Sequence, residues 1–240
     1  MTLGAWKTFR GYLTLCRVSN LPSIWTNVLC AIILATGRFS WEGYLLPALA
    51  LSCFYLAGMC LNDISDAEYD AVHRPSRPIP SGSVSLRGAW ILTILLFATG
   101  TVSLMGTSFR QGLYAAFLLM VIIVWYDLDH KKNLFSVLLM ASCRFLVFTV
   151  ASLAITGKMP AVVIVAGGIQ CAYVVCISII ARHENSKPTP FSIPVIPLML
   201  AGISLLDGIM LAVLVQPPWL LAGIGGAVLM LAGQKYVRGD

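Results

Sequence analysis

Long runs of apolar residues follow one another along nearly the whole chain, separated by short polar segments. Eight runs are long enough to cross a bilayer as α-helices, at residues 21–37, 42–61, 88–108, 111–126, 134–156, 160–180, 192–215 and 217–234. Residues 6–17 are amphipathic and basic, without a cleavable signal pattern, and predict a helix on the membrane surface. The pattern predicts an all-α, polytopic bundle of about eight transmembrane helices, forming a single domain over residues 1–240.

Composition agrees with this prediction. Of the 240 residues, 58% are hydrophobic and 11% are charged, so a water-soluble domain would expose too much apolar surface. Seven cysteines fall mostly inside apolar runs without a CxxC pair, which indicates small apolar fillers and not a metal site. We therefore expect an integral, multi-pass membrane protein whose main partner is the lipid bilayer.

The distribution of basic residues predicts an orientation. Twelve lysines and arginines fall in segments that the eight helices place on one side, whereas the opposite loops carry only Arg38, Arg110 and Lys158. The positive-inside rule then places both termini and the polar loops in the cytoplasm, and we expect a bacterial inner membrane. The net charge of +6 is explained by this topology, so nucleic acid is not an expected partner, and no obligatory protein partner is evident.

One polar stretch, residues 62–82, concentrates the charges of an otherwise apolar chain. If the preceding helix continues, Asp63, Asp66 and Asp70 lie at positions i, i+3 and i+7, and three carboxylates share one face. Asn62 adds a neutral oxygen beside them. Clustered carboxylates are suited to Mg²⁺ carrying a substrate phosphate, whereas the plainer alternative is a solvated helix end at the membrane surface.

A proline-rich loop follows the carboxylates. Three prolines between residues 75 and 80 exclude a regular helix there. Arg74 and Arg77 supply two guanidinium groups, which bind phosphate oxygens in a fixed fork geometry. Carboxylates followed by this loop favour a diphosphate site.

These residues also resemble a known family. The order Asn62-Asp63-x-x-Asp66-x-x-x-Asp70, followed by Arg74-Pro75-x-Arg77-Pro78-Ile79-Pro80-Ser81-Gly82, is similar to the first aspartate-rich motif of the UbiA superfamily of intramembrane prenyltransferases. The resemblance implies two four-helix repeats around a central cavity, Mg²⁺ as cofactor, a prenyl diphosphate substrate and a small aromatic or hydroxylated acceptor. Alternatives are a terpene cyclase of the same fold and, from another class, a non-catalytic lipid-binding or transport protein.

The resemblance extends to the loops at the ends of two later helices. Tyr126, Lys131 and Lys132 match by type a loop that approaches the diphosphate in this superfamily, although an interfacial anchor is the alternative. The loop after residue 180 has Glu184 as its lone carboxylate where relatives carry a second aspartate-rich motif, and Arg182 replaces an acid there. The degenerate second motif predicts an atypical branch of the superfamily. We therefore expect fewer Mg²⁺ ions than two full clusters would hold, with Arg182 binding the diphosphate.

Polar residues also fall deep inside the apolar runs. Arg144 is predicted roughly 15 Å below the surface, where a guanidinium must line a cavity or pair with a carboxylate such as Asp207. Asn27 must likewise pack between helices or face the cavity. Together the sequence assigns catalysis to Asp63, Asp66, Tyr126 and Arg144, metal binding to Asp63, Asp66, Asp70 and Glu184, and diphosphate binding to Asn62, Arg74, Arg77, Lys131, Lys132, Arg182 and Asn27.

Overall fold

A computed structural model describes residues 3–129, 135–185 and 194–237, and in these ranges the regular structure is helical throughout. The elements are α1 (Leu3–Leu15), a 3-10 turn η1 (Val18–Asn20), α2 (Leu21–Thr36), α3 (Trp41–Ser65), α4 (Ala67–His73), α5 (Leu86–Met105), α6 (Gln111–Asp129), α7 (Phe135–Thr156), α8 (Ala161–Asn185), α9 (Val195–Leu214), η2 (Pro217–Trp219) and α10 (Leu220–Gln234).

The long helices coincide with the apolar runs of the sequence. In the described residues, seven segments are long and apolar enough to cross a membrane, and the apolar part of α6, Gln111–Asp127, is slightly shorter. These eight helices confirm the predicted all-α, multi-pass architecture to within a few residues at most ends. The predicted surface helix is α1, which carries the exposed rings of Trp6 and Phe9.

Local signals set several helix ends. The side chains of Ser40 and Ser85 accept hydrogen bonds from the backbone N–H groups of Gly43 and Gly88, at 3.2 and 3.1 Å, and so cap the starts of α3 and α5. Gly37 ends α2 in the left-handed conformation with φ of 74°. Inside the spans, the hydroxyls of Ser52 and Thr93 donate to carbonyl oxygens one turn earlier, so these polar side chains are satisfied within their own helix.

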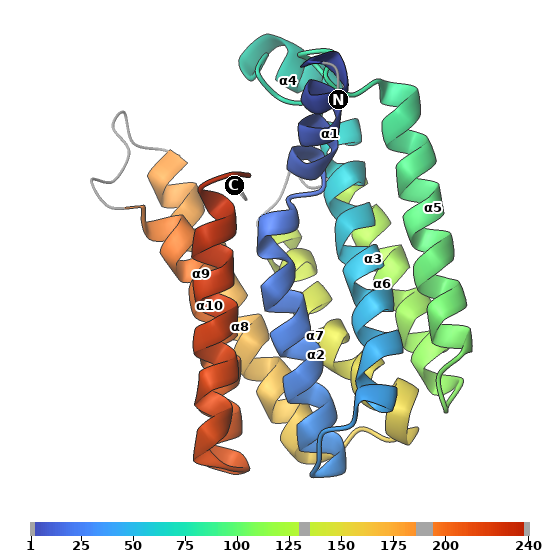
Figure 1. Ribbon diagram of the computed structural model, residues 1–240, viewed down its shortest axis with the longest axis vertical. Coiled ribbons are helices and arrows are strands. Elements are labelled where there is room, and N and C mark those ends of the chain that lie inside the picture. The colour runs from blue at the N-terminus through green and yellow to red at the C-terminus, as the bar shows by residue number, and fades with distance from the viewer. Residues whose placement is uncertain (1–2, 130–134, 186–193, 238–240) are drawn as a thin grey trace.

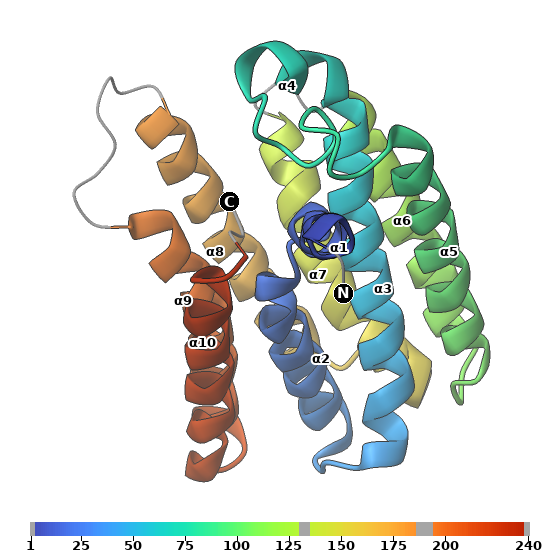
Figure 2. The same cartoon turned by 45° about the horizontal axis from the view of Figure 1, so that its top comes forward.

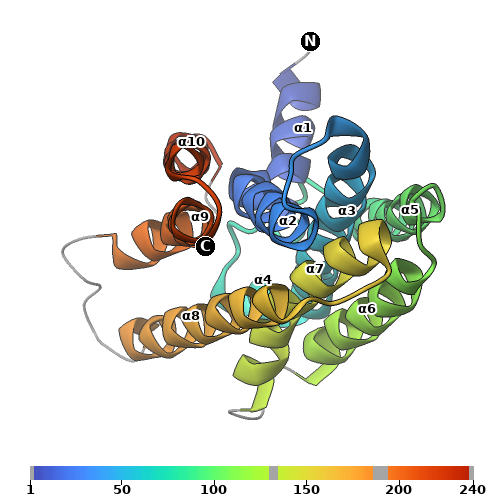
Figure 3. The same ribbon diagram turned by 90° about the horizontal axis from the view of Figure 1, so that it is seen from below.

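The central helix of the bundle is α2, which packs against α3, α7, α8, α9 and α10. On one side of it stand α8, α9 and α10, and on the other α3, α5 and α6 (Figures 2 and 3). The helices α9 and α10 approach closely at Gly208 and Gly223, where a Cβ on either residue would lie 2.7 Å from the opposing Cα. The predicted relation between two four-helix repeats stays a prediction.

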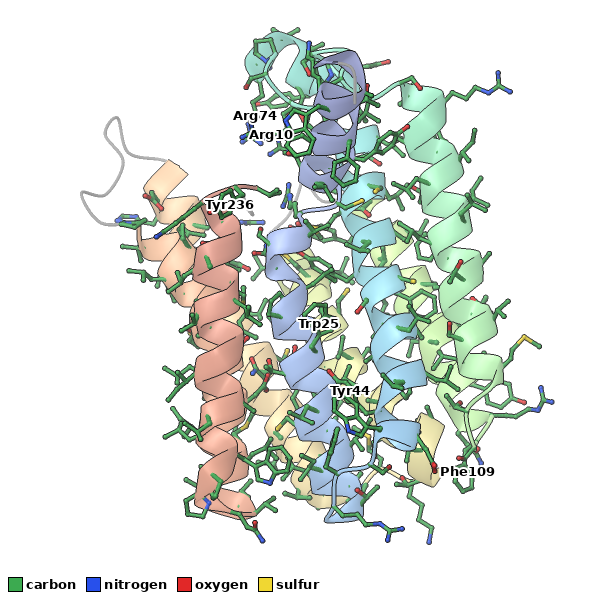
Figure 4. All side chains as sticks on the ribbon, viewed as in Figure 1. Arg10, Trp25, Tyr44, Arg74, Phe109 and Tyr236 are labelled. Carbon is green, nitrogen blue, oxygen red and sulfur yellow. The ribbon has the colours of Figure 1, made fainter. Side chains whose placement is uncertain are left out.

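The polar segments gather at one end of the bundle. Figure 1 shows α1, α4 and the end of α10 together at the top. In Figure 4 Arg10 and Arg74 lie at this end, whereas Tyr44 and Phe109 lie toward the opposite one. A hydrogen bond of 3.5 Å from Arg10 Nη2 to the carbonyl oxygen of Tyr236 ties α1 to the segment after α10. Both described ends of the chain therefore lie on the face that carries the aspartate-rich stretch.

Candidate active site

A large cavity of about 1500 Å³ opens among the helix ends on this polar face. It is lined by residues of α2, α3, α6, α7, α8 and α9 and of the loop after α4. Its mouth carries the charged and amide side chains of Arg17, Asn62, Asp66, Arg74, Arg77, Asp127, Arg182 and Glu184. Deeper walls are apolar, including Leu51, Leu119 and Val147. The cavity is thus an apolar chamber with an ionic entrance.

The side chain of Arg77 lies between two of the carboxylates that the sequence predicts to bind Mg²⁺. Arg77 Nη1 donates to Asp63 Oδ1 at 2.6 Å, and Arg77 Nε lies 3.9 Å from Asp70 Oδ2. Arg17 Nη2 lies 3.6 Å from the same oxygen of Asp63. Asp63 and Asp70 are only 4% and 1% exposed, so the arginine side chains separate both carboxylates from the cavity.

The predicted common face of the three aspartates required one continuous helix. The helix is interrupted between Asp63 and Asp70, so that condition is not met. The first helix, α3, ends at Ser65, and Asp66, with ψ near −1°, joins it to the short helix α4. Among these three carboxylates, Asp66 lines the cavity, whereas Asp63 and Asp70 lie behind Arg77. Within the described ranges, no three Asp, Glu, His or Cys side chains converge as a metal cluster would.

The chemistry of the donor set nevertheless fits Mg²⁺. Carboxylate and amide oxygens are the hard ligands that this ion prefers, and Asn62, Asp63, Asp66 and Asp70 supply them on two adjoining helices. Neither buried oxygen of Asp70 accepts a hydrogen bond from the described residues, and the guanidinium of Arg77 comes no closer than 3.9 Å. A divalent cation would satisfy these oxygens.

The proline-rich loop is folded as a series of turns. Backbone hydrogen bonds run from Ser81 N–H to the Arg77 carbonyl at 2.9 Å and from Val84 N–H to the Pro78 carbonyl at 3.0 Å. Gly82 has φ of 70°, a conformation that favours glycine. The turns hold Arg74 and Arg77 at the cavity, as the sequence predicted (Figure 4 labels Arg74).

The second half of the bundle supplies the opposite rim. Arg182 Nη2 donates to Ser136 Oγ at 2.8 Å, and both residues line the cavity together with Glu184. Tyr126 lines the cavity and its hydroxyl lies 3.6 Å from Met140 Sδ. Lys131 and Lys132 lie outside the described residues.

Three mouth residues were not assigned to the site from the sequence. Asp127 is 3% exposed, lines the cavity and accepts from Asn62 Nδ2 at 3.2 Å. Tyr69 also lines the cavity. Arg17 has positive φ and ψ, 45° and 48°, a left-handed conformation that is uncommon for a residue with a side chain. Asp127 was visible as an extra acid in the sequence, but the backbone conformation of Arg17 has no sequence signal.

At the floor, Arg144 and Asp207 do not meet as the direct pair that the sequence left open. Arg144 Nη1 donates to Asn27 Oδ1 at 2.9 Å, and Asn27 Nδ2 donates to Asp207 Oδ2 at 2.7 Å. Asn27 is fully buried between helices and is absent from the cavity lining. Its predicted role in diphosphate binding is therefore wrong, because both ends of its amide are used by Arg144 and Asp207.

The fold and this entrance define a polytopic membrane protein with an apolar chamber among its helices that opens at an ionic mouth. The model of the UbiA prenyltransferase family matches residues 23–238, and the chain belongs to this family.

Proteins of similar sequence support this family assignment. A digeranylgeranylglyceryl phosphate synthase of Methanococcus aeolicus is 33% identical over 126 residues, which cover 51% of this chain and 44% of that relative. The enzyme of the same name from Methanothermobacter thermautotrophicus is 37% identical over 119 residues, covering 48% and 40% of the two chains. The matched stretch thus spans less than half the length of these relatives.

Solved structures share the fold across nearly the whole chain. A structure described as giving insights into digeranylgeranylglyceryl phosphate synthase in membranes has a TM-score of 0.65 at 17% identity, covering 96% of each chain. A UbiA homologue from Archaeoglobus fulgidus, bound to DMAPP and Mg²⁺, has a TM-score of 0.62 at 17% identity, covering 91% of this chain and 86% of its own.

Proposed function

We propose that this protein is an Mg²⁺-dependent intramembrane prenyltransferase that takes a prenyl diphosphate and transfers its prenyl group to a small acceptor. The observation that carries the proposal is the cavity itself, in which arginines and carboxylates surround the mouth of a chamber with apolar walls. A ligand that fits both parts has an anionic head and a hydrocarbon tail. Family membership and the homologue bound to DMAPP and Mg²⁺ support the same substrate class.

In this proposal the mouth residues hold the diphosphate. Asn62, Asp63, Asp66 and Asp70 hold Mg²⁺, which when bound neutralises diphosphate charge and makes the diphosphate a better leaving group. Arg74 and Arg77 bind diphosphate oxygens, so Arg77 changes partners from carboxylate to diphosphate when the substrate enters.

Arg182 stabilises the departing charge from the opposite rim. Lys131 and Lys132, which lie outside the described residues, are predicted from the sequence to add positive charge for the same purpose. Glu184 contributes the one carboxylate of that rim. A site with this composition holds fewer ions than two complete carboxylate clusters would, because Arg182 supplies fixed positive charge in place of metal.

Prenyl transfer then proceeds in the chamber below the residues that bind the diphosphate. The allylic C1–O bond breaks, and its electron pair leaves on the diphosphate. The apolar walls exclude water from the allylic cation, and Tyr126 presents its ring to the chamber. The acceptor forms the new bond to C1 and loses one proton to the departing diphosphate.

The site is accessible from the cytoplasm in this proposal, because the predicted topology assigns twelve lysines and arginines to the side of the mouth and only three to the other. Placement in a bacterial inner membrane and in an atypical branch of the family stays a prediction. The orientation is measured with Ser81→Cys in sealed vesicles. A thiol reagent that cannot cross the membrane is added from either side, and the side from which residue 81 reacts is the side of the mouth.

The experiment that tests the function uses purified protein with geranyl, farnesyl or geranylgeranyl diphosphate, with and without Mg²⁺. Mass spectrometry then measures bound prenyl diphosphate, released diphosphate and the prenyl product. We expect Mg²⁺-dependent binding and slow diphosphate release even without an added acceptor.

Two other outcomes would point to a different function. Cyclic hydrocarbon products would identify a terpene cyclase of the same fold. Failure of Mg²⁺ and of all three prenyl diphosphates to bind would contradict the proposed function and favour a lipid-binding or transport protein.

A further inference from the structure

Asp127 brings a carboxylate to the mouth of the cavity from outside the aspartate-rich stretch. It lies near the end of α6, is 3% exposed and lines the cavity. Its Oδ1 accepts a hydrogen bond of 3.2 Å from Nδ2 of Asn62, a residue 65 positions earlier on α3. The contact therefore ties the predicted Mg²⁺ ligands at the end of α3 to α6, a helix that packs directly against α3.

This hydrogen bond decides the orientation of the Asn62 amide. A side-chain amide has a donor end, Nδ2, and an acceptor end, Oδ1, whereas an ionised carboxylate only accepts. If the amide of Asn62 were reversed, its oxygen would face the carboxylate of Asp127 and two acceptors would meet. Asp127 thus selects the rotation that directs Oδ1 away from its own carboxylate. Among the described residues, none donates a hydrogen bond to this Oδ1.

Asn62 and Asp66 lie on the same side of the last turn of α3. The backbone N–H of Asp66 donates to the carbonyl oxygen of Asn62 at 3.0 Å, so the two residues are one helical turn apart. Side chains four positions apart lie one above the other on a helix, and both of these side chains line the cavity. The amide oxygen that Asp127 leaves available is therefore next to the carboxylate of Asp66.

We propose that Asp127 is a positioning residue of the Mg²⁺ site, which holds Asn62 Nδ2 so that Asn62 Oδ1 is presented to the cation beside Asp66. The inference rests on the proposed prenyl transfer, in which Asn62 and Asp66 hold Mg²⁺. Asp127 acts through Asn62 and does not contact the ion, because Asp127 lies at the nitrogen end of the amide and the ion is bound at its oxygen end.

The coordination of Mg²⁺ gives a physical reason for such a residue. The ion requires nearly ideal octahedral geometry at about 2.0–2.1 Å, so an amide that rotates freely offers its oxygen in the right place only part of the time. Groups that orient a metal ligand change metal affinity by about 10- to 100-fold. A hydrogen bond to an ionised acceptor is also roughly twice as strong as one to a neutral acceptor, which favours an acid for this role.

The test is a double-mutant cycle of Asn62→Ala and Asp127→Ala, measured on cation binding and not on turnover. The probe ligand is geranylgeranyl thiolodiphosphate, a substrate analogue that resists cleavage. The measured quantity is the Mg²⁺ concentration that gives half-maximal binding of this analogue. Titration with Mn²⁺, followed by electron paramagnetic resonance, measures the affinity for the cation directly.

We expect Asp127→Ala to raise the half-maximal Mg²⁺ concentration by about 10- to 100-fold. In the Asn62→Ala background the same change should have almost no further effect, because the amide through which Asp127 acts is already absent. Saturating Mg²⁺ should restore the affinity of Asp127→Ala for the analogue, which a distorted mouth would not allow. Glu68, exposed on α4, gives the matched control, and Glu68→Ala should leave the Mg²⁺ dependence unchanged.

Asp127→Asn separates the positioning role from the charge. This variant keeps an oxygen that accepts from Asn62 Nδ2 but lacks the negative charge. Its half-maximal Mg²⁺ concentration should therefore lie between those of the wild type and Asp127→Ala. Thermal unfolding shows whether each variant is folded, and if Asp127→Ala is not, Asp127→Asn takes its place in the cycle.

Several results would overturn the inference. Losses of affinity that multiply in the double variant would mean that Asp127 acts on the cation independently of Asn62. An unchanged Mg²⁺ dependence in Asp127→Ala, or a loss in Asp127→Asn as large as that in Asp127→Ala, would also exclude the positioning role. These results leave the proposed prenyl transfer standing. A wild type that fails to bind the analogue at any Mg²⁺ concentration contradicts the proposed prenyl transfer and this inference with it.

Discussion

The mouth and the floor of the cavity hold their charges in opposite ways. At the mouth, Arg77 pairs directly with Asp63 and Asp70, residues within 14 positions of it along the chain. At the floor, Arg144 and Asp207 are joined through the amide of Asn27, which lies 117 and 180 positions away from them. The contacts of Arg77 at the mouth come from one local segment, whereas the contacts at the floor join side chains of four helices.

This difference separates exchangeable contacts from fixed ones. Arg77 lines the cavity, so in the proposed function an incoming diphosphate can reach its guanidinium, while Arg17 remains beside Asp63. The amides at the floor are fully buried, and each of their contacts would be lost without replacement by water. We expect substitutions at the mouth to affect substrate binding and turnover, and substitutions at the floor to affect stability as well.

The largest expected effect is on folding, at the floor. Asn27→Leu removes the amide between Arg144 and Asp207 and leaves both charges without it, which should cost about 3 to 5 kcal/mol. The melting temperature in detergent should fall by on the order of 10 °C. The matched control is Asn62→Leu, which removes an Asn-to-carboxylate bond at the mouth, 3.2 Å long and partly exposed, and should cost about 1 kcal/mol. Equal losses would mean that depth does not distinguish the two regions.

The next effect is on turnover, at the mouth. Asp63→Ala or Asp66→Ala should lower the rate of diphosphate release by about 10²- to 10³-fold, a loss typical of removing one group that stabilises developing charge. Melting temperatures should change less than in Asn27→Leu, because Asp66 and the two arginines that pair with Asp63 line the cavity. The exposed Glu68 on α4 gives the control, and Glu68→Ala should keep full activity. Normal turnover in either aspartate variant would remove the case for Mg²⁺ at this stretch.

A smaller effect distinguishes Arg77 from the carboxylates that it contacts. Arg77→Gln should weaken prenyl diphosphate binding by about tenfold or more, because one charge-assisted hydrogen bond to the substrate is lost. Arg87, exposed at the start of α5, is the control, and Arg87→Gln should bind normally. Tighter binding of the prenyl diphosphate to Arg77→Gln would show that Arg77 competes with Mg²⁺ for the carboxylates and does not bind the diphosphate.

The smallest effect is expected at the opposite rim. Arg182 keeps a hydrogen bond to Ser136 in the absence of substrate, so only part of its interaction is available to the diphosphate. Arg182→Gln should weaken prenyl diphosphate binding by only a few fold, on the order of 1 kcal/mol or less. Isothermal titration with the thiolodiphosphate measures this change. An affinity identical to that of the wild type would remove Arg182 from the site and leave that rim to other residues.

The sequence by itself determined the architecture and the mouth. Apolar runs long enough to span a bilayer must form helices, since an unpaired backbone is too costly in hydrocarbon, and the observed spans match them within a few residues at most ends. The grouping of Asp66, Arg74 and Arg77 at the cavity was also predictable, because these residues are close along the chain and the prolines between them force turns.

Only the tertiary structure decided the partners at the floor. Whether Arg144 meets Asp207 directly or through Asn27 depends on how α2, α7 and α9 are rotated about their axes, and apolar runs without a strong periodic face do not encode that rotation. The bend at Asp66 and the left-handed backbone of Arg17 were hidden for a related reason. The backbone of Arg17 is set by how the surrounding segments pack, since a non-glycine residue takes a left-handed conformation only when its neighbours in space require it.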